Sequence, residues 1–370
     1  MPRIHILGLG NIGNLVAHAL GGVLPQRPPI TLLAHRSQQA REWVKAGRQI
    51  ELITNGVASR RGGYDFELIP ARGDADHSDL VDLDDAATGP ISNVIVCTKA
   101  FNVTAALSEI QHRLTPDSTI LFTQNGMGVV DEVNRGLFKN PDSRPKYLYA
   151  IVFHGLYTNG PFSTVHAGIA SVTLGAIPRR AFSTQQFAGE GLDSSDQHSC
   201  YLTDVMLRDP SLNVKIVSPT ELLHTQLVKL AVNAVINPLT SVLDCFNGEL
   251  FADKATNALI TCLIQETSSV LQALPEVKTL SKSERERFRP EKLTSEVQNT
   301  AQATTRNRSS MLQDIAKNRK TEIDYINGYI VRRGKEVKIE CKMNSALVEM
   351  IKERRFIARE EILEVFSLRL

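Results

Sequence analysis

The stretch SPTELLHTQLVKLAVNAVINPLTSVLDCFNGEL, residues 218–250, carries the signals of a long helix near the middle of the chain. Ser218 is a favourable N-cap, and Pro219 suits the first helical position, where its missing N–H would have no partner. Glu221, three residues after Ser218, completes a capping box. We therefore expect a helix, and with it a second domain, to begin at Ser218.

A polar row is expected along this helix. Lys229, Asn233 and Asn237 recur every four residues, and four residues advance only about 40° past a full turn, so the three side chains share one face. Few other charges surround them, which predicts an enclosed row in which burial lowers the pKa of Lys229 and makes it a proton donor or acceptor. A lysine that extends to solvent is the alternative. Pro238 is expected to kink the helix or loosen its last turn, because proline removes a backbone donor.

The composition is that of a globular chain of 370 residues with a formal net charge of +2. This length favours two domains, which we place at residues 1–217 and 218–370. The charge balance gives no general attraction to nucleic acid, and no apolar run is long enough to span a membrane. The five cysteines lack the paired spacing of a metal site or disulfide framework. A reducing compartment is expected, and without a recognisable leader peptide the cytoplasm is the expected location.

The first strand pattern, residues 3–7, leads into the loop GLGNIG, which consists of Gly8, Leu9, Gly10, Asn11, Ile12 and Gly13. A helical pattern follows. In this context the first glycine permits a tight turn, the second lets a pyrophosphate approach the backbone, and the third allows close helix–strand packing. The loop therefore predicts a dinucleotide-binding site, and a turn without a ligand is the alternative.

Basic and amide residues follow three later strand patterns. Arg36 and Ser37 follow residues 30–35, where an NAD-binding domain carries an acidic residue; a basic residue there suits a 2′-phosphate and favours NADPH over NADH. An ordinary solvated arginine is the alternative. Lys99 is a candidate for a cofactor phosphate, and Asn125 for the nicotinamide or the substrate, although Asn-Gly is also a frequent turn sequence.

The expected fold is an α/β N-terminal domain, with a Rossmann-type doubly wound sheet and an antiparallel extension, followed by an all-α C-terminal domain. Parallel strands are predicted at residues 3–7, 30–35, 51–54, 66–69, 93–98 and 118–123, with helices at 103–114 and 129–137. The extension is predicted at residues 147–158 and 166–177, with a last strand at 214–217. Residues 179–199 are expected to form an exposed insertion.

Helical patterns in the second half occupy residues 252–274, 294–315, 321–335 and 344–364, and the charged segment 277–290 is expected to be a surface connector. Within the second of these helices, Asn307, Ser310 and Asp314 are expected to share one face. Glu322 is placed at a helix start after Thr321, where the helix dipole alone would favour a carboxylate.

Five segments, GLGNIG, CTKA, QNGMG, KLAVNAVINPLTSVLDCFNGEL and NRSSMLQDIAKNRKTEIDYINGYI, resemble motifs of the 2-dehydropantoate 2-reductase (ketopantoate reductase) family in order and over nearly the whole chain. The resemblance implies an NADPH-dependent oxidoreductase that reduces ketopantoate, a small molecule, to pantoate in pantothenate and coenzyme A biosynthesis. A related 2- or 3-hydroxyacid dehydrogenase and a non-catalytic NADP-binding relative are the alternatives. A homodimer is the candidate oligomer.

The resemblance also implies roles for individual residues. Lys229 is implied as the proton donor, Asn125 as its helper, and Glu322 as the carboxylate that holds a substrate hydroxyl. The other implied substrate-binding residues are Asn233, Asn237, Asn247, Asn307 and Ser310. The implied cofactor-binding residues are Gly8, Gly10, Gly13, Arg36 and Lys99, with the rest of the glycine loop and Asn125 beside them.

Overall fold

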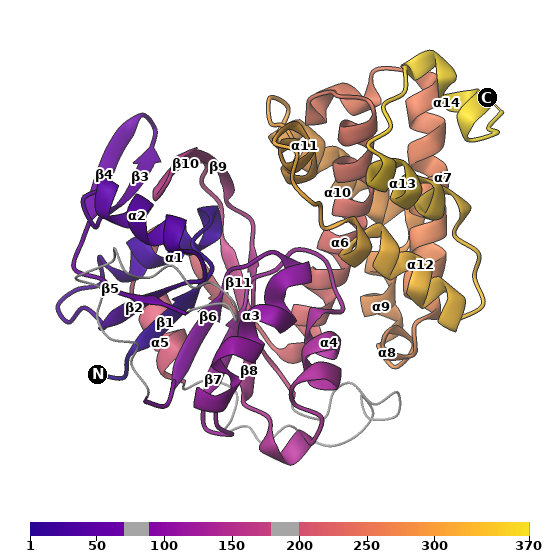
Figure 1. Cartoon of the computed structure of the whole chain (residues 1–370). Helices are drawn as coiled ribbons and strands as arrows, with labels where there is room; N and C mark the ends of the chain where they lie inside the picture. Colours follow the sequence, from indigo (N-terminus) through magenta and orange to yellow (C-terminus); the bar gives the residue numbers. More distant parts are fainter. Residues whose placement is uncertain (70–88, 179–199, 370) are drawn as a thin grey trace. The chain divides into compact units, whose positions relative to one another are not determined.

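The computed structural model describes residues 1–69, 89–178 and 200–369 (Figure 1). Of these, residues 1–69, 89–124, 129–178 and 200–222 form one compact unit, and residues 125–128 and 223–369 form the other. The division falls within the first turns of helix α6 (Pro219–Val242). The insertion predicted at residues 179–199 lies outside the described residues.

The first unit is built on an eight-stranded sheet with the order β12-β11-β8-β7-β6-β1-β2-β5. All neighbouring strands are parallel except β8 and β11, which are antiparallel. The predicted Rossmann-type sheet and its antiparallel extension are thereby confirmed. The strands are β1 (Ile4–Leu7), β2 (Ile30–Ala34), β5 (Asp65–Leu68), β6 (Asn93–Val96), β7 (Thr119–Phe122), β8 (Lys146–Val152), β11 (Val172–Ile177) and β12 (Val214–Ile216).

A second sheet corrects two predictions. Its order is β4-β3-β10-β9, with strands β3 (Ile50–Thr54), β4 (Val57–Arg61), β9 (Gly155–Gly160) and β10 (Ser163–Gly168). Residues 51–54 therefore do not join the parallel sheet, and each predicted strand of the extension is split between the two sheets. The reason lies in helix α1 (Asn11–Leu20), which contacts β1 and also β3, β9 and β10, so that both sheets cover its buried sides.

The other helices of this unit are α2 (Ser37–Lys45), α3 (Val103–Ile110), α4 (Val129–Gly136) and α5 (Tyr201–Leu207). Neither α2 nor α5 was predicted from the sequence. Trp43 of α2 is fully buried, stacks on Phe66 with ring centroids 5.6 Å apart and tilts against Phe162 at 4.9 Å. These aromatic contacts join α2 to β5 of the first sheet and to the turn between β9 and β10 of the second.

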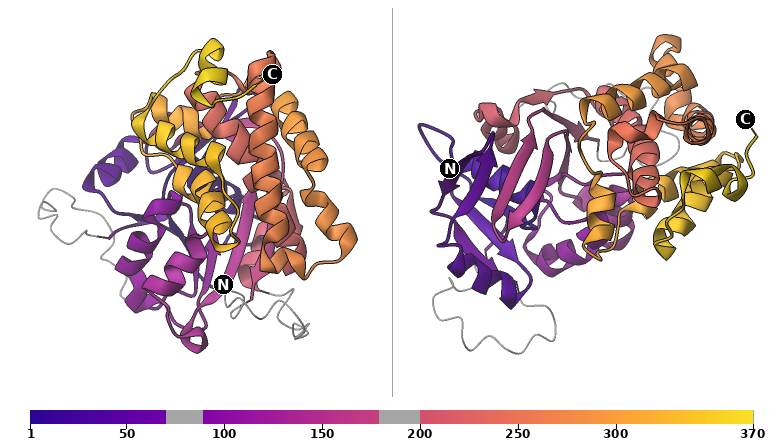
Figure 2. Two further views of the ribbon diagram at one scale, coloured as in Figure 1. Left: turned by 90° about the vertical axis from the view of Figure 1, so that its right-hand side faces the viewer. Right: turned by 90° about the horizontal axis from the view of Figure 1, so that it is seen from above.

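The second unit is all-α, as predicted, and Figure 2 shows its helices from two further directions. Helix α7 packs against α10, α12 and α13. No helix among the described residues is long and apolar enough to cross a membrane. Besides α6, the helices are α7 (Lys254–Ala273), α8 (Pro275–Lys278), α9 (Lys282–Arg285), α10 (Pro290–Ala303), α11 (Ser310–Ala316), α12 (Asn327–Glu336), α13 (Lys342–Glu353) and α14 (Ile362–Val365). The 3₁₀ turns are η5 (Asn247–Phe251), η6 (Glu286–Phe288), η7 (Ile323–Tyr325) and η8 (Arg359–Glu361).

Three predictions for this unit are corrected. The helix predicted at 294–315 is divided into α10 and α11, because Ser309 accepts a hydrogen bond from the Leu312 N–H (3.1 Å) and starts a new helix. The predicted surface connector at 277–290 contains short helices whose Val277 and Phe288 are fully buried. The helix predicted at 344–364 ends at Glu353, after which Arg354 adopts a left-handed conformation.

Helix α6 begins as the sequence predicts. The backbone N–H of Glu221 donates to Ser218 Oγ (3.2 Å), which confirms Ser218 as the N-cap. The helix then continues through Pro238 to Val242, so the proline lies in the helix interior. A proline at such a position leaves the carbonyl group four residues earlier without its helical donor.

Candidate active site

The glycine loop between β1 and α1 has the geometry that a dinucleotide needs. Gly8 has φ +104°, and a Cβ there would lie 2.6 Å from the Thr98 backbone nitrogen. A Cβ at Gly13 would collide with the carbonyl oxygen of Gly8, whereas a Cβ at Gly10 would meet nothing within 4 Å. The first and third glycines are therefore required by packing, and the open space beside the second fits a phosphate at the helix N-terminus.

The side chains of the loop have other contacts. The Oδ1 atom of Asn11 accepts hydrogen bonds from Thr158 (2.9 Å) and Thr164 (3.3 Å), which fix the start of α1 to the second sheet. Leu9 and Ile12 are half-buried and pack against the core. For these residues, only the backbone is well suited to a ligand.

The two predicted basic residues lie after strands of the parallel sheet. Arg36 is exposed and is the N-cap residue of α2, two residues after the end of β2. Lys99 is half-buried and precedes a 3₁₀ turn after β6. Both follow the carboxyl ends of strands, where such sheets bind their ligands.

The polar row of α6 lies in the second unit. Lys229 and Asn233 are half-buried, and Asn237 is buried. Burial lowers the pKa of Lys229 to about 8, while the Glu322 carboxylate acts in the opposite direction and raises it. Lys229 therefore titrates close to neutral pH, with a carboxylate near enough to influence it.

Glu322 is buried, but its local structure differs from the prediction. Residues 321–335 do not form one helix. Glu322 precedes the 3₁₀ turn η7, and the irregular Ile326 separates that turn from α12. The side chain of Glu322 makes no helix-capping hydrogen bond, so capping does not explain why a carboxylate is buried there.

The segment after β7 brings Asn125 into the same unit as Lys229 and Glu322. The Met127 N–H donates to the carbonyl oxygen of Tyr325 (2.8 Å). Gly126 has φ +81°, and a Cβ there would collide with the same oxygen. Only glycine allows this close approach. Gly126 and Met127 therefore contact η7, and the half-buried Asn125 directly precedes them.

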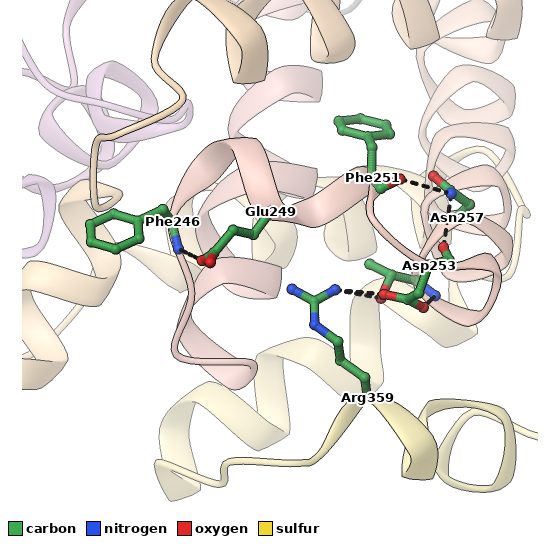
Figure 3. Close-up of polar contacts among 7 residues, drawn as sticks. Phe246, Glu249, Phe251, Asp253, Asn257 and Arg359 are labelled. Carbon is green, nitrogen blue, oxygen red and sulfur yellow. Dashed lines mark hydrogen bonds and ion pairs between the residues drawn. The ribbon is translucent and has the colours of Figure 1, made fainter.

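Asn247 and Asn307 lie together where η5 meets the loop between α10 and α11. The Phe246 N–H donates to Glu249 at the start of η5 (2.6 Å; Figure 3). The Asn247 N–H donates to the carbonyl oxygen of Asn307 (3.0 Å), and Asn247 Nδ2 donates to Thr304 (2.9 Å). The buried Oδ1 of Asn247 accepts no hydrogen bond from the part of the chain that the structure describes.

The expectation that Asn307, Ser310 and Asp314 share one helical face is wrong. Asn307 precedes α11 and is not helical, because Ser309 caps that helix. Ser310 is exposed at the first helical position, whereas Asp314 is buried and pairs with Arg319 at 3.2 Å. Asp314 therefore has a structural partner.

Two buried polar residues near these positions were not singled out from the sequence. The Thr240 hydroxyl of α6 donates to Ser309 (2.8 Å), and Asn327 Nδ2 donates to the carbonyl oxygen of Ala234 in α6 (2.8 Å). The sequence indicated indirectly that the Ala234 carbonyl needs a donor from elsewhere, because Pro238 has no N–H to offer it. Nothing local indicated that Asn327 supplies it.

A glycine loop in a Rossmann-type sheet, together with a lysine of lowered pKa in a helical unit, fits a Rossmann-type oxidoreductase. The described residues contain no group of histidine, cysteine, aspartate or glutamate side chains arranged to hold a metal ion. Residues 4–179 match the family model described as "Ketopantoate reductase PanE/ApbA", and residues 221–355 match "Ketopantoate reductase PanE/ApbA C terminal". The chain belongs to the ketopantoate reductase family, whose members are oxidoreductases.

Individual curated proteins and solved structures are similar to this chain. The chain is 27% identical to the probable 2-dehydropantoate 2-reductase of Schizosaccharomyces pombe, over 95% of this chain and 96% of the relative. It is 32% identical to the ketoisovalerate reductase of Gibberella intermedia, over 75% of this chain and 70% of the relative. The crystal structure of a PanE/ApbA family ketopantoate reductase from Ralstonia eutropha has the same fold, with a TM-score of 0.70 at 18% identity, over 97% of this chain and 99% of that one.

Proposed function

We propose that this protein is a 2-dehydropantoate 2-reductase that reduces ketopantoate to pantoate with NADPH, in pantothenate biosynthesis. The observation that carries the proposal is the pKa of Lys229, which burial lowers and the charge of the buried Glu322 carboxylate partly raises again. A lysine that titrates near pH 8 is mostly protonated at neutral pH and gives up its proton readily. The bound NADPH would supply a hydride to the ketone carbon, and Lys229 would protonate the oxygen that becomes the new hydroxyl.

The assignment of NADPH depends on residues of the first unit. Gly8, Gly10 and Gly13 form the loop, and open space remains at Gly10 for the pyrophosphate. Arg36 would hold the 2′-phosphate, since an exposed guanidinium follows β2 where an NAD-specific domain carries a carboxylate. Lys99 would contact a cofactor phosphate.

The substrate would be held by the polar residues of the second unit. Glu322 would accept a hydrogen bond from the ketopantoate hydroxyl, and Asn125 would orient Lys229 and the substrate. A site that hydrogen-bonds a hydroxyl rejects analogues without it more strongly than apolar packing does. The further substrate contacts that we propose are Asn233, Asn237, Asn247, Asn307 and Ser310.

A second candidate is the reduction of 2-oxoisovalerate (ketoisovalerate). It is favoured by the ketoisovalerate reductase of Gibberella intermedia, which is 32% identical to this chain. The two substrates share the 2-oxo acid group, but 2-oxoisovalerate lacks the hydroxyl that Glu322 would bind. Preference between them therefore tests the proposed role of Glu322.

The experiment is to follow NADPH oxidation by the purified protein with ketopantoate, 2-oxoisovalerate and pyruvate, at the absorbance of the reduced nicotinamide. A kcat/KM at least about tenfold higher for ketopantoate than for 2-oxoisovalerate, roughly 1.4 kcal/mol of discrimination, would support the proposal. A preference for 2-oxoisovalerate would replace it with the second candidate. Protein that binds NADPH but oxidises it with none of the three would contradict both.

A further inference from the structure

Helix α6 contains a proline in its interior, and a side chain from another helix compensates for it. Pro238 has no N–H, so the carbonyl oxygen of Ala234 lacks the helical donor four residues later. Asn327, at the first position of α12, donates its Nδ2 to that oxygen at 2.8 Å. Both residues are buried, with exposures of 1% for Ala234 and 0% for Asn327, where an unsatisfied carbonyl would be unfavourable.

A chain of hydrogen bonds fixes the orientation of the Asn327 amide. Asn327 Nδ2 also donates to Asn344 Oδ1 (3.0 Å), and Asn344 Nδ2 donates to Glu266 Oε2 (2.9 Å). The Glu266 carboxylate also accepts from the backbone N–H groups of Met343 (2.9 Å) and Asn344 (3.1 Å) at the start of α13. With the opposite amide orientation, Asn327 would direct its oxygen at two acceptors, so this arrangement is the one that satisfies them.

The compensated carbonyl belongs to the stretch of α6 between Asn233 and Asn237, two residues of the polar row. Ala234 directly follows Asn233, and Pro238 directly follows Asn237. The course of α6 between these positions sets how Asn237 is placed relative to Lys229 and Asn233. The ring of Pro238 crowds the Ala234 carbonyl, and a helix can bend where a proline interrupts its hydrogen bonds. The hydrogen bond from Asn327 holds that carbonyl in one orientation.

We propose that Asn327 is a positioning residue: it supplies the donor that Pro238 lacks and so keeps Lys229, Asn233 and Asn237 aligned on α6. The effect of Asn327 on catalysis rests on the proposed function. Its role as the donor to the Ala234 carbonyl does not depend on that function. Because the missing N–H belongs to Pro238, restoring that N–H should make Asn327 less necessary.

The test is a double-mutant cycle of Asn327→Leu and Pro238→Ala. Leucine has the same branching as asparagine but has no donor, so Asn327→Leu should lower the Tm by about 5 °C. In this background, Pro238→Ala provides a backbone N–H for the Ala234 carbonyl and should recover at least half of the loss. The gain from Pro238→Ala should be clearly smaller when Asn327 is present. If Asn327→Leu does not fold, Asn327→Ala enters the same cycle.

Asn257→Leu is a matched control. Asn257 Nδ2 also donates to backbone carbonyl oxygens, those of Asp253 (2.8 Å) and Phe251 (3.3 Å; Figure 3), but α6 is not involved. Its effect on Tm should add to that of Pro238→Ala without coupling. Additive effects of Asn327→Leu and Pro238→Ala would overturn the proposal.

Kinetics distinguish positioning from a purely structural role. Asn327→Leu should lower kcat with ketopantoate by about tenfold while the affinity for NADPH stays unchanged, and Pro238→Ala should restore kcat together with Tm. Recovery of Tm without recovery of kcat would contradict the positioning role. If the unmodified protein reduces neither ketopantoate nor 2-oxoisovalerate, the proposed function fails, and the Tm cycle by itself still decides whether Asn327 replaces the donor of Pro238.

Discussion

Glu322 acts on Lys229 in the helical unit: the carboxylate stabilises the protonated lysine while burial destabilises it, and the resulting pKa of Lys229 is about 8. Burial is the larger of the two effects. The balance keeps most of the lysine protonated at neutral pH and leaves the proton easy to transfer. This is the property expected of a group that protonates a developing alkoxide.

The first prediction concerns this balance. Because Glu322 raises the pKa of Lys229, Glu322→Gln should lower that pKa further. The protonated form is the active one in the proposed reaction, so activity should fall as the pH rises through about 8 in the unmodified protein. In the variant, the fall should begin at lower pH, by about one unit. The measurement is kcat/KM for ketopantoate as a function of pH.

Asp324→Asn is the control for this shift. Asp324 lies two residues after Glu322 but pairs with Lys352 at 2.6 Å. Its neutralisation should therefore leave unchanged the pH at which activity falls on the alkaline side of the profile, the alkaline limb. An alkaline limb that stays at the same pH in Glu322→Gln would show that Glu322 does not set the pKa of the proton donor.

The second prediction concerns Lys229 itself. Methionine has a similar length but cannot donate a proton, so Lys229→Met should lower kcat by about 10²- to 10⁴-fold. NADPH binding, measured by fluorescence titration, should be nearly unchanged. Lys254→Met, which removes an exposed lysine at the start of α7, should retain activity. Loss of NADPH binding in Lys229→Met would assign the lysine to the cofactor instead.

The third prediction separates two glycines of the loop. A Cβ at Gly10 meets no neighbouring atom within 4 Å, so Gly10→Ala should fold normally but bind NADPH at least about tenfold more weakly, since the methyl group occupies the space of the pyrophosphate. A Cβ at Gly13 collides with the Gly8 carbonyl oxygen, so Gly13→Ala should lower the Tm as well. Thermal unfolding and NADPH titration of both variants provide the measurement. Full NADPH affinity in Gly10→Ala would place the pyrophosphate elsewhere.

The fourth prediction concerns the choice of nicotinamide cofactor. Arg36→Ala should reduce the ratio of kcat/KM for NADPH to that for NADH by about tenfold or more, because the guanidinium would no longer pair with the 2′-phosphate. Arg41→Ala is the control, since Arg41 is also exposed on α2 but one turn further along. If the ratio changes equally in both variants, general positive charge and not a specific contact determines the preference.

The sequence determined the features whose causes lie within a few residues. The N-cap of α6 depends on Ser218 and the residues directly after it, and the capping hydrogen bond is present. The glycine loop is defined by the spacing of three glycines after a short apolar strand. The parallel sheet followed from the alternation of strands and helices. In each case local conformation and periodicity are sufficient, because the interactions involved span one or two turns.

Tertiary structure alone decided the features that depend on distant partners. Residues 50–54 had the pattern of any buried strand, and the pairing with β4 and β10 assigned them to the second sheet. Asn307 fitted a helical face until the cap at Ser309 placed it before α11. The partner of the Ala234 carbonyl, Asn327, is 93 residues away. A hydrogen bond or a strand contact can form with any complementary group that packing brings close. The local sequence does not specify which group that will be, so such pairings are decided by how the whole chain packs.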